Sequence, residues 1–245
     1  MIDVGAATHQ GHYRRGNEDA AVAAYPLFLV ADGMGGHAAG EVASAIATET
    51  MAEIGESEPS LPMLVAQVQE ANRRIRAEGT KPGRRGLGTT LTGIAALADG
   101  SWAVLNVGDS RVLMTRQGEL RQLTTDHSEV QDMVELGLLA PEEAAVHPMR
   151  HVITRSLGAA DSVAVDHDRI ELIPGDRVLV CSDGLTDEVP PDEIFWVMDT
   201  AGGPQEAAEA LVTAALTRGG HDNITVVVVD VVADQVGSLI DAGEE

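Results

Sequence analysis

Short apolar runs separated by polar and glycine-rich breaks recur along the 245 residues. Their pattern predicts strands at 2–8, 21–24, 27–31, 89–97, 101–107, 112–115, 163–172, 176–181 and 224–229. Apolar residues at helical spacing predict helices at 38–54, 61–75, 128–139, 141–145, 192–198 and 205–216. Tight turns join several strands, and helices do not alternate strictly with them. We therefore expect an α+β fold with mainly antiparallel sheets, in one domain over residues 1–235 followed by a tail at 236–245.

Composition narrows the class of protein. The net charge of −23 argues against a nucleic-acid partner, because phosphate backbones need clustered Lys and Arg. The only cysteine, Cys181, excludes an intrachain disulfide and follows an apolar run, so we expect a buried, inert thiol. The sequence shows no signal-peptide pattern and no stretch long enough to cross a membrane, which favours a cytoplasmic protein.

Four aspartates stand at the ends of the most apolar strands. Asp32, Asp109 and Asp183 each follow one, and Asp222 lies just before the run 224–229. Asp-Gly is common in turns, so any one of them could reflect turn chemistry alone. If the last strand runs antiparallel to its neighbours, however, all four fall on one rim. The pattern predicts an aspartate cluster at one end of a sandwich.

Two further acids are expected to join this cluster. In RRGNED an extended backbone would point Arg14 and Glu18 to the same face, and a helical turn at 183–187 would bring Asp187 beside Asp183. Crowded carboxylates need a counter-charge, and oxygen ligands without paired His or Cys favour Mg²⁺, Mn²⁺ or Ca²⁺. Acids that come from distant parts of the sequence are typical of a two-metal site, where Arg14 would bind a phosphate.

Several motifs then point to one family. The segments RRGNEDA, ADGMGGHAAGEVAS, GTTLT, NVGDSR, LVCSDGLTD and GGHDNITVVVV resemble the bacterial metal-dependent serine/threonine protein phosphatases of the type 2C or PPM family. The resemblance covers about residues 2–230. It implies a four-layer α-β-β-α sandwich and two Mn²⁺ or Mg²⁺ ions. It also implies hydrolysis of phosphoserine and phosphothreonine by direct attack of a metal-bridging water. The expected partners are phosphorylated proteins and a cognate Ser/Thr kinase, and we expect a monomer.

The resemblance also implies roles for individual residues. Asp32 matches the carboxylate that bridges the two ions, and Arg14 matches the phosphate-binding arginine. The other ligands of the two ions are expected to be Glu18, the Gly33 carbonyl, Asp183 and Asp222. A weaker third site would use Asp109, Asp183 and Asp187. Asp19 and Asn223 are expected to orient these ligands without binding metal.

One position departs from the family pattern. Met34 stands directly after the Asp-Gly. Many eukaryotic members of the family carry a histidine at or near this position, which is proposed as the general acid. A thioether cannot take this role, because it has no proton to donate. His37 is a candidate donor, and a metal-bound water is the alternative. Residues 124–155 match a mobile flap, and we expect His127, His147 and His151 there to be surface or hydrogen-bonded residues. Two alternative functions stay open: a non-catalytic metal-binding relative, and a metallohydrolase of small phosphate esters.

Overall fold

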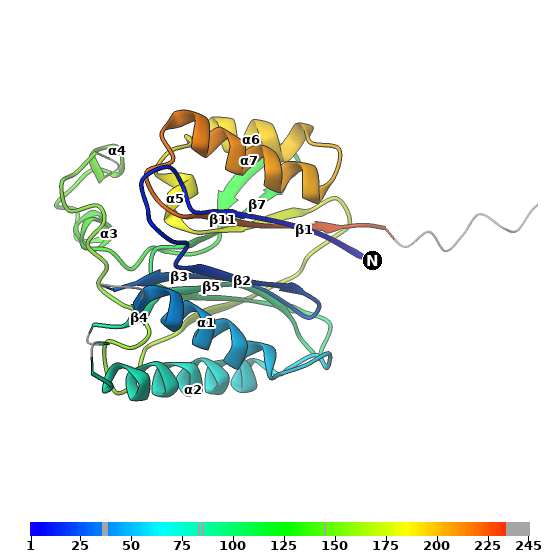
Figure 1. Ribbon diagram of the computed structural model, residues 1–245. Helices are drawn as coiled ribbons and strands as arrows, with labels where there is room; N and C mark the ends of the chain where they lie inside the picture. The colour runs from blue at the N-terminus through cyan, green and yellow to red at the C-terminus, as the bar shows by residue number, and fades with distance from the viewer. Residues whose placement is uncertain (36–38, 83, 85, 145, 234–245) are drawn as a thin grey trace, which may run out of the picture.

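Two β-sheets stack face to face, with a pair of helices on each outer side (Figure 1). The computed structural model describes residues 1–35, 39–82, 84, 86–144 and 146–233. Helices α1 and α2 cover one sheet, and α6 and α7 cover the other. The α+β class and the four-layer α-β-β-α sandwich are confirmed. The single-domain boundary at 235 stays a prediction, and the tail at 236–245 lies outside the described residues.

The strands are β1 (Ile2–His9), β2 (Asp19–Ala24), β3 (Leu27–Met34), β4 (Gly88–Thr89), β5 (Leu91–Ala96), β6 (Trp102–Val107), β7 (Arg111–Arg116), β8 (Glu119–Gln122), β9 (Asp166–Ile170), β10 (Arg177–Cys181) and β11 (Ile224–Val231). The helices are α1 (Ala39–Ala52), α2 (Leu61–Gly79), α3 (Glu129–Glu135), α4 (Pro141–Ala144), α5 (Asp183–Thr186), α6 (Pro191–Thr200) and α7 (Pro204–Arg218). In the part of the chain that the structure describes, no helix is both long and apolar enough to span a bilayer.

Strand order brings the ends of four apolar strands to one rim. One sheet has the order β1-β11-β10-β7-β8, and the other has β2-β3-β5-β6-β9, with β4 paired to β3. Strands β3 and β6 both pair antiparallel with β5, so their carboxyl ends lie at the same edge. Strands β10 and β11 are antiparallel, so the end of β10 lies beside the start of β11. The expected convergence of the strand ends follows from this topology.

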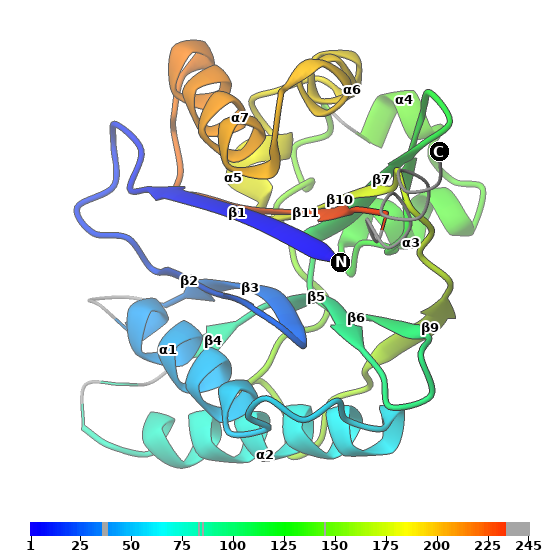
Figure 2. The same cartoon turned by 90° about the vertical axis from the view of Figure 1, so that its right-hand side faces the viewer.

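Three apolar clusters fill the three spaces between the four layers. The central cluster joins the inner faces of the two sheets and includes Phe28, Trp102 and Val180. The cluster under α1 and α2 includes Leu29 and Met51, both fully buried. The third lies under α6 and α7, and Figure 2 shows these helices above β1 and β11, on the side away from the other sheet. Because the middle of each sheet is packed on both faces, the central strands β3, β5, β6, β10 and β11 are continuous apolar runs rather than alternating ones.

Several elements differ from the sequence-based expectation. Strand β8 was not expected, and β9 begins at Asp166 rather than at Val163, because its residues are largely exposed and lack the apolar signal. Helix α3 ends at Glu135, four residues before the predicted end at Leu139. Residues 11–13 form a turn and residues 15–16 a bend, so the segment that carries Arg14 is not an extended strand. The premise that put Arg14 and Glu18 on one face was therefore wrong.

Candidate metal centre

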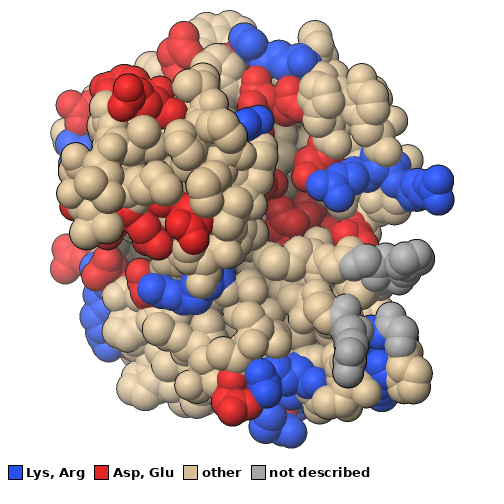
Figure 3. Space-filling view, turned by 90° about the vertical axis from the view of Figure 1, so that its left-hand side faces the viewer, with Lys and Arg blue, Asp and Glu red and all other residues tan. Residues whose placement is uncertain are grey.

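A cavity of about 730 Å³ opens at the rim where the strand ends meet. Its lining includes the expected residues Arg14, Glu18, Asp32, Gly33, Asp183, Asp187, Asp222 and Asn223. Glu188 also lines it, so six carboxyl groups face two arginines, Arg14 and Arg150, among the described lining residues. Figure 3 looks onto this end of the molecule and shows Asp and Glu side chains in a recess, with Lys and Arg side chains beside it.

Asp32 is held near the end of β3 by hydrogen bonds to its backbone. The Asp32 N–H donates to the Thr90 hydroxyl over 2.9 Å, and the Asp32 carbonyl accepts from the Thr90 N–H over 2.9 Å and from the Thr89 hydroxyl over 2.8 Å. On the other side, Asp32 is the direct cross-strand partner of Asp19. The backbone beneath this carboxylate is thus fixed from both neighbouring segments.

Asp183 and Asp222 meet because two backbone segments approach closely. Asp183 begins the short helix α5, directly after β10, and Asp222 precedes β11. A Cβ at Gly184 would lie 1.9 Å from the Asn223 carbonyl oxygen. Only glycine therefore allows the first turn of α5 to pack against the segment that carries Asp222.

Asn223 holds the segment of Arg14 and Glu18 against this rim. Its side-chain amide donates to the carbonyls of Gln10 and Gly16, each over 2.9 Å. Its side-chain oxygen accepts from the Glu18 N–H over 2.8 Å. These three bonds explain why both residues reach the cavity although the segment is not extended. The amide of Asn223 is thus hydrogen-bonded through both its nitrogen and its oxygen, which fits the positioning role expected for it.

Glu18 and Gly33 are packed against the start of α1. The Gly33 N–H donates to the Glu18 carbonyl over 3.2 Å, and the Ser44 hydroxyl donates to the same carbonyl over 2.5 Å. A Cβ at Gly33 would lie 2.3 Å from the Gly40 carbonyl oxygen. The backbone at Gly33 therefore comes close to both segments, as the sequence suggested.

Arg14 lies at the rim and pairs with an acid of the cluster. Its Nη2 donates to Asp222 Oδ2 over 2.5 Å, and about half of the arginine side chain stays exposed. Burial alone would lower the pKa of Arg14, but the carboxylates of Asp222, Asp32 and Glu18 raise it. The guanidinium is therefore a permanent cation that can bind an anion entering from solvent.

The acids in the cavity are hard to ionise together. Burial, and then the charges of Asp19 and Asp183, raises the pKa of Asp32 well above its ordinary value. Burial, and then the charge of Asp109, does the same to the pKa of Asp183. Burial raises the pKa of Asp19 to about 6. Oxygen donors this crowded fit hard divalent cations, which would supply the positive charge that the carboxylates need.

Asp109 and Asp187 lie around a second, adjoining cavity of about 510 Å³, which Asp183 also lines. Burial, and then the charge of Asp126, raises the pKa of Asp109 to about 7. Asp109 is 6% exposed, and among the described residues its Oδ1 has no hydrogen-bond partner. An unpaired buried carboxylate oxygen is costly, and a bound cation would satisfy it. Asp109 therefore fits the predicted third metal site.

The histidines of residues 124–155 fall in different places. His127 is buried and accepts from the Gly108 N–H over 2.9 Å, and His147 accepts from the Met149 N–H over 3.2 Å. His151 instead lines both cavities, with its Nδ1 3.1 Å from Asp187 Oδ2. It lies in a loop without periodicity, so no sequence signal indicated this position. His37 lies outside the described residues.

The two sulfur-containing residues Met34 and Cys181 offer neither a proton donor nor a nucleophile. Met34 lines the cavity but has no proton to donate. Burial raises the pKa of the Cys181 thiol to about 12, so this cysteine is no nucleophile.

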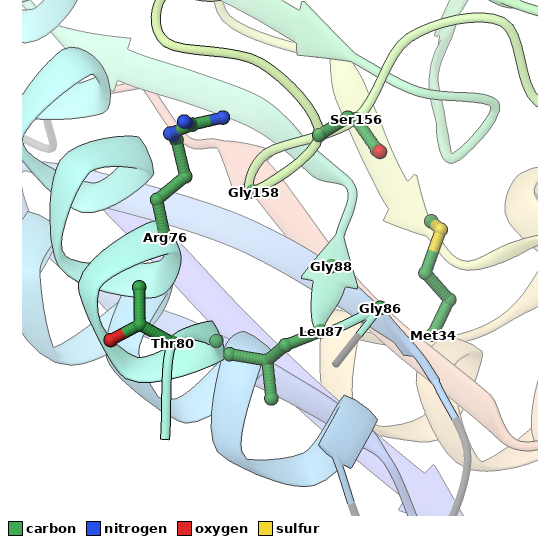
Figure 4. A pocket seen from close by; sticks show the side chains of 10 residues that line it. Met34, Arg76, Thr80, Gly86, Leu87, Gly88, Ser156 and Gly158 are labelled. Atoms are coloured by element: carbon green, nitrogen blue, oxygen red, sulfur yellow. The ribbon is translucent and has the colours of Figure 1, made fainter. Parts of the chain in front are cut away.

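Met34 also borders a separate cavity of about 400 Å³ (Figure 4). There Arg76 of α2 and Thr80, the residue that follows this helix, lie on one side, and Met34 and Ser156 lie on the other. Since no carboxylate is among the described residues that line it, it is unsuited to cations.

A cavity that gathers several carboxylates and an arginine at its rim is typical of a metal-dependent hydrolase of phosphate esters. Residues 10–216 match the model of the family described as Protein phosphatase 2C. The chain belongs to this family, the metal-dependent serine/threonine protein phosphatases, as its motifs predicted.

Curated relatives agree with this assignment. The chain is 42% identical over 238 residues to the serine/threonine protein phosphatase PstP of Mycobacterium tuberculosis, covering 95% of this chain but 45% of the relative. It is 36% identical over 237 residues to the serine/threonine phosphatase stp of Listeria welshimeri, covering 91% of this chain and 93% of the relative. The chain therefore spans about half the length of PstP and nearly all of stp.

Solved structures agree as well. A crystal structure of the M. tuberculosis PstP has a TM-score of 0.90 at 39% identity and covers 95% of this chain and 99% of that one. A structure of the PstP catalytic domain in complex with two manganese ions has a TM-score of 0.85 at 38% identity, with coverage of 95% and 99%. A relative with this fold therefore binds manganese.

Proposed function

We propose that this chain hydrolyses phosphoserine and phosphothreonine in phosphorylated proteins by direct attack of water, with no covalent enzyme intermediate. The observation that carries the proposal is the cavity shared by Glu18, Asp32, Asp183 and Asp222 with Arg14 at its rim. The acids come from separate segments of the sequence, and the raised pKa values of Glu18, Asp32 and Asp183 indicate a deficit of positive charge around them. This arrangement favours a catalytic phosphatase over a non-catalytic relative.

The ligands divide between the proposed ions. Asp32, Asp183 and Asp222 would hold one Mn²⁺ or Mg²⁺, and Glu18, Asp32 and the Gly33 carbonyl would hold the other. Asp109, Asp183 and Asp187 would hold a third, weaker one. When bound, the ions polarise the attacking water and neutralise charge on the phosphoryl group. This assignment rests on the lining of the two cavities and on the chemistry of the donor set.

The chain's own groups position the substrate and the ligands. Arg14 binds phosphoryl oxygens with its guanidinium, and its attraction to Asp222 keeps it at the rim. Asn223 fixes the backbone at Glu18 through the bond described above. Asp19 accepts from the Ser182 hydroxyl over 2.9 Å and so couples β2 to the segment before Asp183. These two residues orient ligands without binding metal.

The wider biology is also a proposal. The expected partners are phosphorylated proteins and a cognate Ser/Thr kinase, and the expected states are a monomer and a cytoplasmic location. Light scattering of the purified chain tests whether it is a monomer, and fractionation of cells that produce it tests whether it is cytoplasmic. A dimer or a membrane-pellet location would contradict the respective expectation.

A phosphatase assay with matched variants tests the activity. The purified chain should release phosphate from a phosphothreonine peptide and from p-nitrophenyl phosphate with Mn²⁺, lose activity in EDTA, and regain it with Mn²⁺. Asp32→Ala and Asp183→Asn should lower turnover by about a thousandfold or more. Asp168→Asn, an exposed aspartate on β9, is the control and should be unchanged.

Two outcomes would overturn the proposal. One is undiminished turnover in either site variant with native circular dichroism. The other is preferred hydrolysis of a nucleotide over the phosphopeptide, which would indicate the alternative, a metallohydrolase of small phosphate esters.

A further inference from the structure

A histidine lines the second cavity beside its acids. The carboxyl groups of Asp109, Asp183 and Asp187 line it together with those of Asp126 and Glu188, and His151 reaches the same cavity from the loop between α4 and β9. His151, Asp183 and Asp187 each offer one ligand atom, and these three atoms all lie within 4.8 Å of one another. A nitrogen donor thus joins a group of donors that is otherwise all oxygen.

The spacing suits a single cation. Adjacent ligands of an octahedral ion with bonds of about 2.1 Å lie about 3 Å apart, and opposite ligands lie about 4.2 Å apart. The 3.1 Å between His151 Nδ1 and Asp187 Oδ2 equals the adjacent spacing. Small side-chain rotations can bring the third atom within reach, because His151 and Asp187 are about half and one-third exposed. An ion can therefore take the place of the direct His151–Asp187 contact.

Asp109 provides the independent observation. The residue is more than nine-tenths buried, it lines the same cavity, and its buried Oδ1 lacks a hydrogen-bond partner among the described residues. The nearby Arg111 does not satisfy this oxygen, because its guanidinium is bound to Asp126 at 2.6 Å. A cation between Asp109 and the other donors would supply the missing partner.

We propose that His151 is a nitrogen ligand of the third divalent cation, together with Asp109, Asp183 and Asp187. The proposal rests on the proposed function, because Asp183 belongs to both sites. Imidazole favours Mn²⁺ and later transition ions over Mg²⁺, which prefers oxygen ligands. His151 therefore gives this site a preference for transition ions and ties its loop to the bound metal.

Pulsed electron paramagnetic resonance of the Mn²⁺-loaded chain tests the contact directly. With excess Mn²⁺ the native chain should show the ¹⁴N coupling of a directly bound imidazole. His151→Gln should lose this coupling. His147→Gln, a change of the same type in the same loop, should keep it, because His147 bonds only to local backbone in the described structure.

Metal titration measures the selectivity. His151→Gln should weaken the third Mn²⁺ site by about tenfold or more and change third-site Mg²⁺ affinity by less than about twofold, as expected for the loss of a nitrogen ligand. Asp187→Asn removes an oxygen donor instead and should weaken both metals at this site. Circular dichroism of each variant establishes that it is folded.

Three results would overturn the proposal. They are no ¹⁴N coupling in the native chain at saturating Mn²⁺, coupling that persists in His151→Gln, and equal loss of Mn²⁺ and Mg²⁺ affinity in that variant. The first would leave His151 as an ordinary ion-pair partner of Asp187. Failure of the proposed function is separate, because it would appear as an inactive native chain whatever the ¹⁴N result.

Discussion

Replacing Asp109 by Asn should stabilise the metal-free protein, and the gain should grow with pH. Asp109 is buried beside Asp126, and its pKa is raised from 3.8 to about 7. Between those two values the folded chain keeps a proton that the unfolded chain has lost. The free energy of unfolding therefore falls as pH rises through this window and stays at the lower value above it.

The size of the effect follows from the same pKa. Each tenfold change in proton affinity is worth about 1.4 kcal/mol, so holding Asp109 ionised in the folded protein costs about 4 kcal/mol. At pH 5 most of this cost is absent, because the folded carboxyl is still protonated. The stability advantage of Asp109→Asn should therefore widen by about 3 kcal/mol between pH 5 and pH 8. Asp19, whose pKa is raised to about 6, contributes a slope of the same sign in both proteins.

Urea denaturation in EDTA, followed by circular dichroism at pH 5, 6.5 and 8, measures this difference. Asp168→Asn is the matched control, since this aspartate is exposed on β9 and should show no widening. Added Mn²⁺ should stabilise the native chain more than it stabilises the Asp109→Asn variant, because the variant lacks one proposed ligand. Parallel pH curves for native and variant, or a variant less stable at pH 8, would refute the electrostatic reasoning.

The remaining predictions concern the substrate and the scaffold. Arg14→Ala should lower kcat/KM for a phosphopeptide by about tenfold to a hundredfold in steady-state kinetics, because it removes a charged hydrogen bond to the phosphate. The control Arg15→Ala should change kcat/KM little, and equal effects of the two variants would contradict the role of Arg14. Asn223→Ala leaves the Glu18 N–H and two carbonyls unpaired and should cost about 1–3 kcal/mol of stability in urea denaturation; no loss would contradict its positioning role. Gly184→Ala should fail to fold or lose metal binding in a Mn²⁺ titration, because its Cβ would lie 1.9 Å from a carbonyl oxygen. The control Gly203→Ala has open space around the added Cβ and should keep both its fold and its metal binding.

Much of the candidate site could be predicted because strand ends carry the acids. Asp32, Asp109, Asp183 and Asp222 adjoin apolar runs that are hard to misread, and antiparallel pairing places those ends at one rim. The sequence motifs added the family, and with it the four layers. Roles of single residues as ligands stay predictions until an ion is located.

The parts that could not be predicted depend on contacts between distant segments. Arg14 and Glu18 reach the cavity through the amide of Asn223, more than 200 positions away, and not through strand parity. His151 lies in a loop with no periodic pattern, so its approach to Asp187 has no local signature. Strand β9 was placed too early because exposed strand residues give no apolar signal.

A crystal of the chain grown with Mn²⁺ tests the central claim most directly. Anomalous difference peaks should lie within coordination distance of Asp32, Asp183, Asp222 and Glu18. A manganese-soaked crystal with no peak among these four side chains would contradict the account.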